Sequence, residues 1–186
     1  ADTERELEVV SLLKKDAIER FLHELEGDGA VLAARPAIWS RLAPAGTPQP
    51  RGTALSLDQV ARGTREAYGY RRILLFDRER RVAYPETKGA VDAEINRGVA
   101  AAMDEARARF VDLHYDAAGC SCYGMAYPVR LNGEPQGEVV GAVYVEVDAS
   151  RELQAIVQQW PAGHASAAAV LVRAERDGVR VLLGTG

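Results

Sequence analysis

Residues 122–148, CYGMAYPVRLNGEPQGEVVGAVYVEVD, decide the fold of this chain. Apolar and aromatic side chains dominate 122–131 and 138–148, a composition typical of two β-strands. Asn132-Gly133 lies between them, and this dipeptide is a strong hairpin signal because both residues adopt left-handed backbone conformations easily. The stretch therefore predicts an antiparallel pair of strands at the centre of a sheet.

Sequence before this hairpin supplies further strands. Residues 70–77 and 81–85 predict two strands joined by a turn at 78–81, and 109–116 predicts another. Together these segments indicate an antiparallel sheet of about five strands.

Helical periodicity marks the two ends and the middle of the chain. Apolar residues recur at three- and four-residue steps through 3–34, which predicts one long helix, ended before Pro36. At about 1.5 Å per residue this helix would span roughly 45 Å, so we expect part of it to project as a stalk or to pair with a second copy. Shorter helices are predicted at 56–69, 90–108 and 150–160. The repeating apolar positions of the long helix are Leu7, Val10, Leu13, Ala17, Phe21, Leu25 and Leu32.

The predicted fold class is α+β, with the long helix packed on the antiparallel sheet. We expect three parts: an N-terminal stalk helix and loop (1–55), a core (56–160) and a C-terminal hairpin (161–186) that is either the start or the remnant of a second module. The hairpin would turn at Asp177-Gly178.

Composition narrows the class of protein. The chain has 186 residues, 47% of them apolar and 27% charged, as expected for a globular domain. Its net charge of −4 argues against non-specific nucleic-acid binding, which needs a basic surface. No apolar run is long enough for a membrane span, and the opening residues carry acids where a signal peptide carries bases.

Cys120 and Cys122 are the two cysteines, and they allow several interpretations. With His114, and with Met125 as a thioether, they could form a soft metal site, although zinc usually takes four ligands from paired motifs. A disulfide between them would join residues about 6.6 Å apart in a strand, at the upper end of the bridging range. The ordinary alternative is a pair of small thiols at the start of a strand. No nucleophile with a neighbouring base, phosphate loop or dinucleotide motif is present, so no enzyme and no cofactor are predicted.

Polar and aromatic side chains alternate along the predicted strands, which suggests a pocket over one face of the sheet. The opposite positions, among them Val111, Leu113, Val143, Val145 and Val147, suit packing against the long helix. The alternative is a partly solvated face covered by tyrosines. The predicted pocket residues are Tyr84, Asp112, His114, Tyr123, Tyr127 and Tyr144.

The stretches 7–36, 73–82 and 127–148, taken in this order and spacing, resemble the extracytoplasmic PAS-like (Cache) sensor domains of bacterial membrane receptors. The stretch 73–82, ILLFDRERRV, resembles their hairpin, with Arg80 where glycine is usual, and 153–183 resembles the exit from one such module into a second. The Arg-Trp-Tyr…Asp signature of related amino-acid sensors is absent. The other matching positions are Lys14, Ile18, Phe21, Leu22, Asp28, Leu32, Ala33 and Pro36 in the long helix and Pro128, Gly137, Gly141 and Asp148 in the central strands.

The resemblance implies a non-enzymatic, small-molecule-sensing input domain of a transmembrane signalling protein, tethered to the membrane on its periplasmic or extracellular side. The output would be a histidine kinase, a cyclase or a chemotaxis module. A homodimer through the long helix is a further expectation. Two alternatives stay open: a metal or redox sensor built on Cys120, Cys122 and His114, and a structural dimerisation module with no ligand.

Overall fold

A computed structural model describes residues 2–50, 55–85, 91–116, 118–158, 170–175 and 178–184. The chain divides into two compact units. One is Leu25–Asp148, and the other combines 1–24 with 149–186. Each unit is described by itself below.

The Leu25–Asp148 unit contains a five-stranded antiparallel sheet in the order β2-β1-β5-β4-β3, which confirms the predicted α+β class. The central strands β4 and β5 are long and rich in buried residues, as the opening stretch of sequence predicted. The strands are β1 (Arg72–Phe76), β2 (Val82–Tyr84), β3 (Arg109–Tyr115), β4 (Ser121–Arg130) and β5 (Val139–Asp148).

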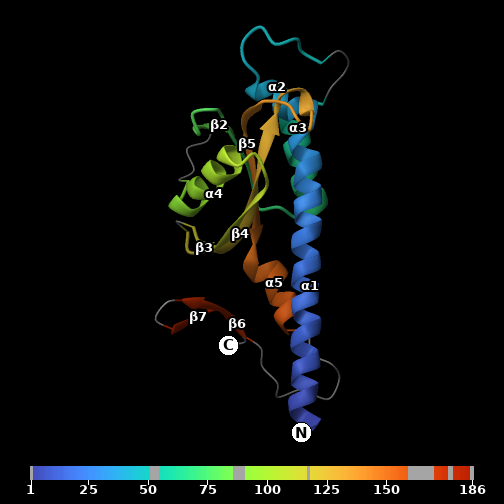
Figure 1. Cartoon of the computed structure of the whole chain (residues 1–186), viewed down its shortest axis with the longest axis vertical. Coiled ribbons are helices and arrows are strands. Elements are labelled where there is room, and N and C mark those ends of the chain that lie inside the picture. The colour runs from blue at the N-terminus through green and yellow to red at the C-terminus, as the bar shows by residue number, and fades with distance from the viewer. Residues whose placement is uncertain are drawn as a thin grey trace. The chain divides into compact units, whose positions relative to one another are not determined.

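Helices cover both faces of this sheet (Figure 1). Helix α4 (Ala93–Asp104) lies on one face, which we call the α4 face. The opposite face, which we call the α1 face, is covered by α2 (Pro36–Leu42), α3 (Leu57–Tyr68) and the part of α1 (Asp2–Ala33) that begins at Leu25. The apolar core under α4 consists of Leu74, Phe76, Ile95, Val99, Ala102, Val111, Ala126, Ala142 and Tyr144.

Side-chain caps begin two of these helices. Ser56 forms a capping box with Gln59, in which each side chain bonds the other's backbone N–H. Asp92 caps α4, and its Oδ1 accepts from the backbone N–H of Ile95 at 2.9 Å. This cap also fixes the Asp92 carboxylate at the edge of the sheet.

Two local features differ from expectation. Pro36 was expected only to end the long helix, but it is also the first residue of α2. Proline fits there because the backbone N–H of a helix's first residue has no partner within the helix. Asn132 and Gly133 have left-handed φ angles of 59° and 69°, but they do not form a two-residue hairpin. They belong to a short 3-10 turn, and the ladder ends at Arg130 and Val139, so 131–138 form a longer connection.

The other unit holds α1 up to Glu24, α5 (Ala149–Gln158) and a hairpin of β6 (Val170–Glu175) and β7 (Gly178–Gly184). Nζ of Lys14 donates to the carbonyl of Ile156 at 2.8 Å and so satisfies an acceptor near the end of α5. Trp160 and Asp177, expected in the closing helix and at the hairpin tip, lie outside the described residues. Within the described ranges, no helix is both long enough and apolar enough to cross a membrane.

Candidate functional site

The register of β4 against β5 determines which side chains share a face. Tyr127 lies opposite Val143, whereas Ala126 lies opposite Tyr144. Directly opposed residues of an antiparallel pair point to the same face. Tyr123 and Tyr127 therefore lie on the α1 face, together with valines that were expected on the other side, and Tyr144 lies on the α4 face.

A bulge in β3 moves His114 to the α4 face. Val111 pairs with Gly124 and His114 with Cys122, so β3 contains one residue more than β4 between these pairs. Strict alternation had placed His114 with Asp112. Instead Asp112 is exposed, and the side chain of His114 is only 5% exposed.

The six predicted pocket residues thus occupy separate places. His114 and Tyr144 are together on the α4 face, whereas Tyr123 and Tyr127 pack on the opposite face. Tyr84 is at the edge of the sheet, where its hydroxyl donates to Oδ1 of Asp58 at 2.9 Å. The single lined face that alternation suggested is not formed, because register and the bulge decide the faces.

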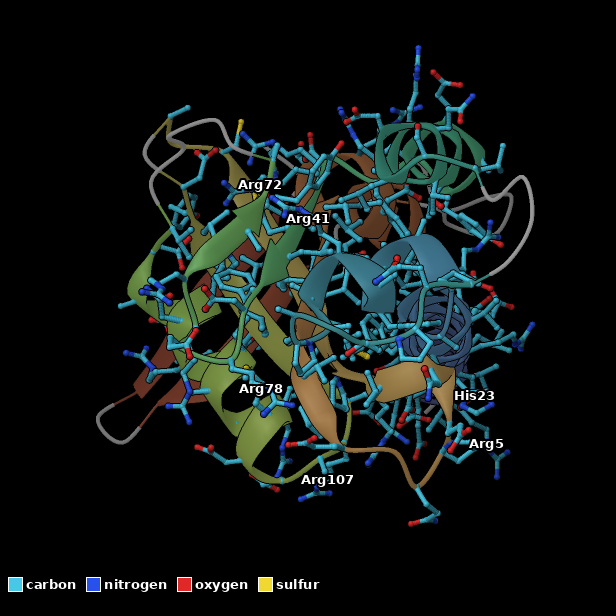
Figure 2. The ribbon with its side chains drawn as sticks, turned by 90° about the horizontal axis from the view of Figure 1, so that it is seen from above. Arg5, His23, Arg41, Arg72, Arg78 and Arg107 are labelled. Atoms are coloured by element: carbon cyan, nitrogen blue, oxygen red, sulfur yellow. The ribbon has the colours of Figure 1, made fainter. Side chains whose placement is uncertain are left out.

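A buried carboxylate anchors a polar cluster on the α4 face. Glu146 is fully buried, and two arginines bind it. Arg71 reaches Oε1 through Nη1 at 3.0 Å, and Arg72 reaches Oε1 through Nε at 2.9 Å and Oε2 through Nη2 at 2.7 Å. Such pairing offsets the large cost of burying a charge. Figure 2 shows that Arg72, at the start of β1, is well separated from Arg78, which follows the strand and pairs with Glu138.

Arg71 extends this cluster to the CxC motif. Its guanidinium also donates to the carboxylate of Asp116 and to Sγ of Cys122. The Arg71 hydrogen bond lowers the pKa of Asp116, and the backbone N–H of Cys120 acts in the same direction. Burial, with a smaller contribution from the charge of Glu146, raises the pKa of the Cys122 thiol to about 11. Cys122 is therefore a buried neutral thiol and a poor nucleophile.

Two buried polar atoms beside this cluster have no hydrogen-bond partner among the described residues. They are the Tyr144 hydroxyl and Nε2 of His114. Nε2 lies 3.3 Å from Oδ2 of Asp92 but is not aligned for a hydrogen bond. Burial raises the pKa of Tyr144, and the charges of Glu146 and Asp92 raise it further. The hydroxyl lies against Gly124, where an added Cβ would be 2.5 Å from it. Buried polar groups normally have partners, so this spot could receive a polar ligand or water.

On the α1 face, Tyr127 joins the sheet to α1. Its hydroxyl donates to the carbonyl of Leu25, and its ring lies against Gly29. A Cβ at position 29 would lie 1.9 Å from Cζ of the ring, so glycine is required there. Tyr127 is thus a packing residue, although one edge of its ring is near a surface hollow.

That hollow has a volume of about 370 Å³, within the range of small-molecule pockets. Its lining includes five alanines and four charged residues. Its charged lining groups have both signs, and Arg130 is already bonded to two carbonyls. The lining residues are Glu26, Ala30, Ala33, Ala34, Ala106, Arg107, Ala108, Tyr127, Pro128, Arg130, Gly133, Glu134 and Pro135.

The residues of the metal alternative do not form a cluster of ligands in the part of the chain that the structure describes. Across the described ranges, no group of three or more His, Cys, Asp or Glu side chains is arranged to hold a metal ion. Cys120 and Cys122 are free thiols; His114 lies directly opposite Cys122 across β3 and β4, and Sγ of Cys122 accepts from Arg71. Met125 lies on the α1 face, on the other side of the sheet.

The pocket residues predicted from the sequence did not include Asp92, Arg71 or Glu146. The helix cap at Asp92 was a usable signal, since an acidic residue precedes the periodic segment of α4. Arg71 and Arg72 lie at the start of a predicted strand, a position that gives no signal of pairing with a buried acid. Glu146 stands at an apolar-flanked position of a central strand, which was a sign of a buried and paired charge.

The chain matches no family model and no curated protein. Solved structures do match. The ligand-binding domain of the Pseudomonas aeruginosa amino-acid chemoreceptor PctC, in complex with GABA, is 20% identical, with a TM-score of 0.54 over 84% of this chain and 68% of that one. The sensory domain of the Campylobacter jejuni chemoreceptor Tlp3 is 12% identical, with a TM-score of 0.60 over 82% of this chain and 62% of that one.

These matches define the class of fold. The chain has the α+β fold of the sensory domains of bacterial chemoreceptors, as its resemblance to PAS-like sensors implied. It spans about two thirds of the length of these two neighbours.

Proposed function

We propose that this chain is the ligand-sensing input domain of a bacterial transmembrane receptor, exposed on the extracytoplasmic side of the membrane. The observation that carries the proposal is the pair of buried, unsatisfied polar atoms on the α4 face, in a fold otherwise known from chemoreceptor sensory domains. A small molecule bound there would complete the hydrogen bonds that Tyr144 and His114 lack. The domain itself performs no catalysis in this proposal.

Of the residues predicted from the sequence, His114 and Tyr144 belong to the proposed site, and Asp92, Glu146 and Arg71 are added. Tyr84, Tyr123 and Tyr127 are given structural roles at the edge of the sheet and on the α1 face. Asp112 is exposed, and its carboxylate accepts from the backbone N–H of Leu113 at 2.7 Å.

Transmission would run through the elements that leave the sheet. β5 carries Tyr144 and Glu146 and passes directly into α5, and β4 carries Tyr127, which holds α1. In this proposal both α1 and the segment after α5 lead towards the membrane and the output module, and the 161–186 region begins a second module. A ligand that binds one arrangement of the sheet better than another would shift the population of these elements.

A thermal-shift screen of the purified chain tests the proposed site. Small organic acids, amines and neutral polar molecules are screened, and at least one is expected to raise the melting temperature. Tyr144→Phe should abolish that shift, because it removes the unsatisfied hydroxyl but keeps the ring. Tyr115→Phe, at an exposed tyrosine, is the matched control. A screen without any stabilising compound would contradict the proposal, as would a shift that survives Tyr144→Phe.

We also propose that receptor chains pair through the N-terminal part of α1. Large apolar side chains are exposed along it, among them Leu7, Val9, Leu12 and Leu13. Sedimentation equilibrium is expected to show a concentration-dependent dimer that Leu12→Glu weakens. A monomer at all concentrations would count against pairing through this helix.

A further inference from the structure

The groups around the unsatisfied spot on the α4 face are mainly hydrogen-bond acceptors. Nδ1 of His114 lies 2.8 Å from the carbonyl oxygen of Asp112. A carbonyl can only accept, so the proton of the neutral ring is on Nδ1, and Nε2 presents a lone pair. That lone pair faces Oδ2 of Asp92, another acceptor, at 3.3 Å. These two atoms need a donor, which is either a second proton on Nε2 or a donor group of a bound molecule.

Groups that would attract an anion are already occupied. Oδ1 of Asp92 accepts from the Ile95 N–H at the N-terminus of α4, so the helix already has a carboxylate at its positive end. Arg71 and Arg72 bind Glu146, and Arg71 also binds Asp116. Both guanidiniums of this cluster therefore already hold carboxylates of the protein itself. The internal Glu146 takes the place that such a carboxylate would fill.

The charges of the cluster agree with this arrangement. Asp92, Asp116 and Glu146 are three acids, and Arg71 and Arg72 are two bases, which leaves one negative charge in excess. Glu146 is fully buried and the Asp92 side chain is 27% exposed, so solvent screens this excess charge only in part.

We propose that the ligand of this site is a small amine without a carboxylate, whose ammonium donates to Asp92, His114 and Tyr144. This inference rests on the proposed sensing function and specifies its ligand class. The ammonium supplies the donor that Nε2 and Oδ2 need, and it also bonds the lone pair of the Tyr144 hydroxyl. Because Arg71 and Arg72 are already paired, an amino-acid ligand would have to bury its carboxylate without a partner, which is costly. The site therefore disfavours amino acids.

Three four-carbon probes test the head-group preference by calorimetry: n-butylamine, butyrate and 4-aminobutyrate. We expect n-butylamine to bind, 4-aminobutyrate to bind at least tenfold more weakly, and butyrate not to bind. Equal or tighter binding of either carboxylate-bearing probe would overturn the proposal, as would failure of n-butylamine to bind. If the thermal-shift screen finds an organic acid whose binding is lost in Tyr144→Phe, the sensing function stands and only the inference of an amine ligand fails. If nothing binds, the sensing function fails too.

Variants separate the ammonium contacts from general stability. Asp92→Asn keeps the helix cap, since asparagine is an equally good cap, and should weaken n-butylamine binding at least tenfold. Glu94→Gln, at an exposed acid in the first turn of the same helix, is the control and should leave affinity unchanged. Equal losses in both variants would overturn the assignment.

Asp116→Asn tests the filled guanidiniums. It removes one of the charges that occupy Arg71 and leaves the buried Glu146 in place. The preference for n-butylamine over 4-aminobutyrate is expected to fall by several fold, because Arg71 becomes available to a carboxylate. An unchanged preference would show that occupied arginines do not set the selectivity.

Discussion

Two glycines near the end of α1 have different surroundings. Gly27 is exposed, and a Cβ placed there would meet nothing within 4 Å. Gly29 is buried against the ring of Tyr127, which occupies the space of a side chain. Glycine weakens a helix, yet α1 continues past both residues to Ala33. One of them makes room for the sheet, and the other has no steric role.

Alanine substitutions should therefore have opposite effects. Gly27→Ala is expected to raise the free energy of unfolding by about 0.5–1 kcal/mol, because alanine loses less backbone entropy in a helix. Gly29→Ala should lower it by about 1–3 kcal/mol, since Tyr127 or the helix must move. Urea unfolding of both variants measures this difference. Two changes of the same sign would contradict the packing of Tyr127 on α1.

The two cysteines should differ in reactivity. At pH 8 a thiol reagent is expected to modify the half-buried Cys120 in the native protein and to leave Cys122 unmodified, whereas both react in urea. Mass spectrometry of the labelled peptides provides the measurement. Rapid native labelling of Cys122 would contradict its burial next to Arg71.

The raised pKa of Cys122 also implies a pH dependence. Its value of about 11 in the folded protein exceeds the value of about 8.5 expected in the unfolded chain. The neutral thiol therefore stabilises the fold below about pH 8.5, and this contribution is lost as pH rises through about 11. Cys122→Ser should flatten this alkaline decrease in stability, and Cys120→Ser should not.

At the scale of elements, the turn between β1 and β2 contains an arginine at a position where the backbone conformation favours glycine. Arg80 occupies the position where glycine was expected, and it has a left-handed φ of 62°. The turn is still closed, since the backbone N–H of Arg80 donates to the carbonyl of Asp77 at 2.9 Å. The turn therefore keeps its hydrogen bond, but Arg80 adopts a left-handed backbone conformation that is unfavourable for a residue with a side chain.

Arg80→Gly is expected to raise the free energy of unfolding by about 0.5–1 kcal/mol, because it relieves this conformation. Arg80→Ala keeps the strain and removes only the exposed ion pair with Asp104, so it should change stability little or lower it. Thermal unfolding of the two variants compares them. An alanine variant as stable as the glycine variant would contradict the strain argument.

Element type was more predictable than the assignment of faces. Alternation and turn residues located every strand of the core sheet, and apolar periodicity located α1, α3 and α4. The shared face of Tyr144 and Glu146, opposite to Tyr127, follows from the pairing of β4 with β5, which depends on contacts between distant segments. The bulge that moves His114 breaks alternation within a strand and has no clear local sequence signal.

At the scale of the molecule, the core sheet should be uneven in stability. β5 pairs on both sides and is almost fully buried, whereas β2 is three residues long and lies at the edge. Native hydrogen exchange is expected to be slowest in β4 and β5 and fastest in β2, because edge pairing opens without global unfolding. Mass spectrometry of exchanging peptides measures this order, and comparable protection of β2 and β5 would contradict it.

The candidate site was only partly predictable because it assembles residues from separate parts of the chain. His114 and Tyr144 could be named from their type and place in strands. Their partners Asp92 and Arg71 come from a helix cap and from the residue before a strand, and only the folded sheet brings them together. A site of this kind has no short motif that a sequence search could recognise.

The buried Glu146 also bears on how the sheet is assembled correctly. Arg72 lies directly opposite it across β1 and β5. A slip of one residue between these strands would turn the Arg72 side chain to the other face and remove the two hydrogen bonds that it donates to the buried carboxylate. An uncompensated buried charge costs about 3–5 kcal/mol, which is a large share of the stability of a domain. The ion pair therefore favours the correct strand register during folding. The free-energy cost that it imposes on the shifted sheet is far larger than its contribution to the stability of the native sheet.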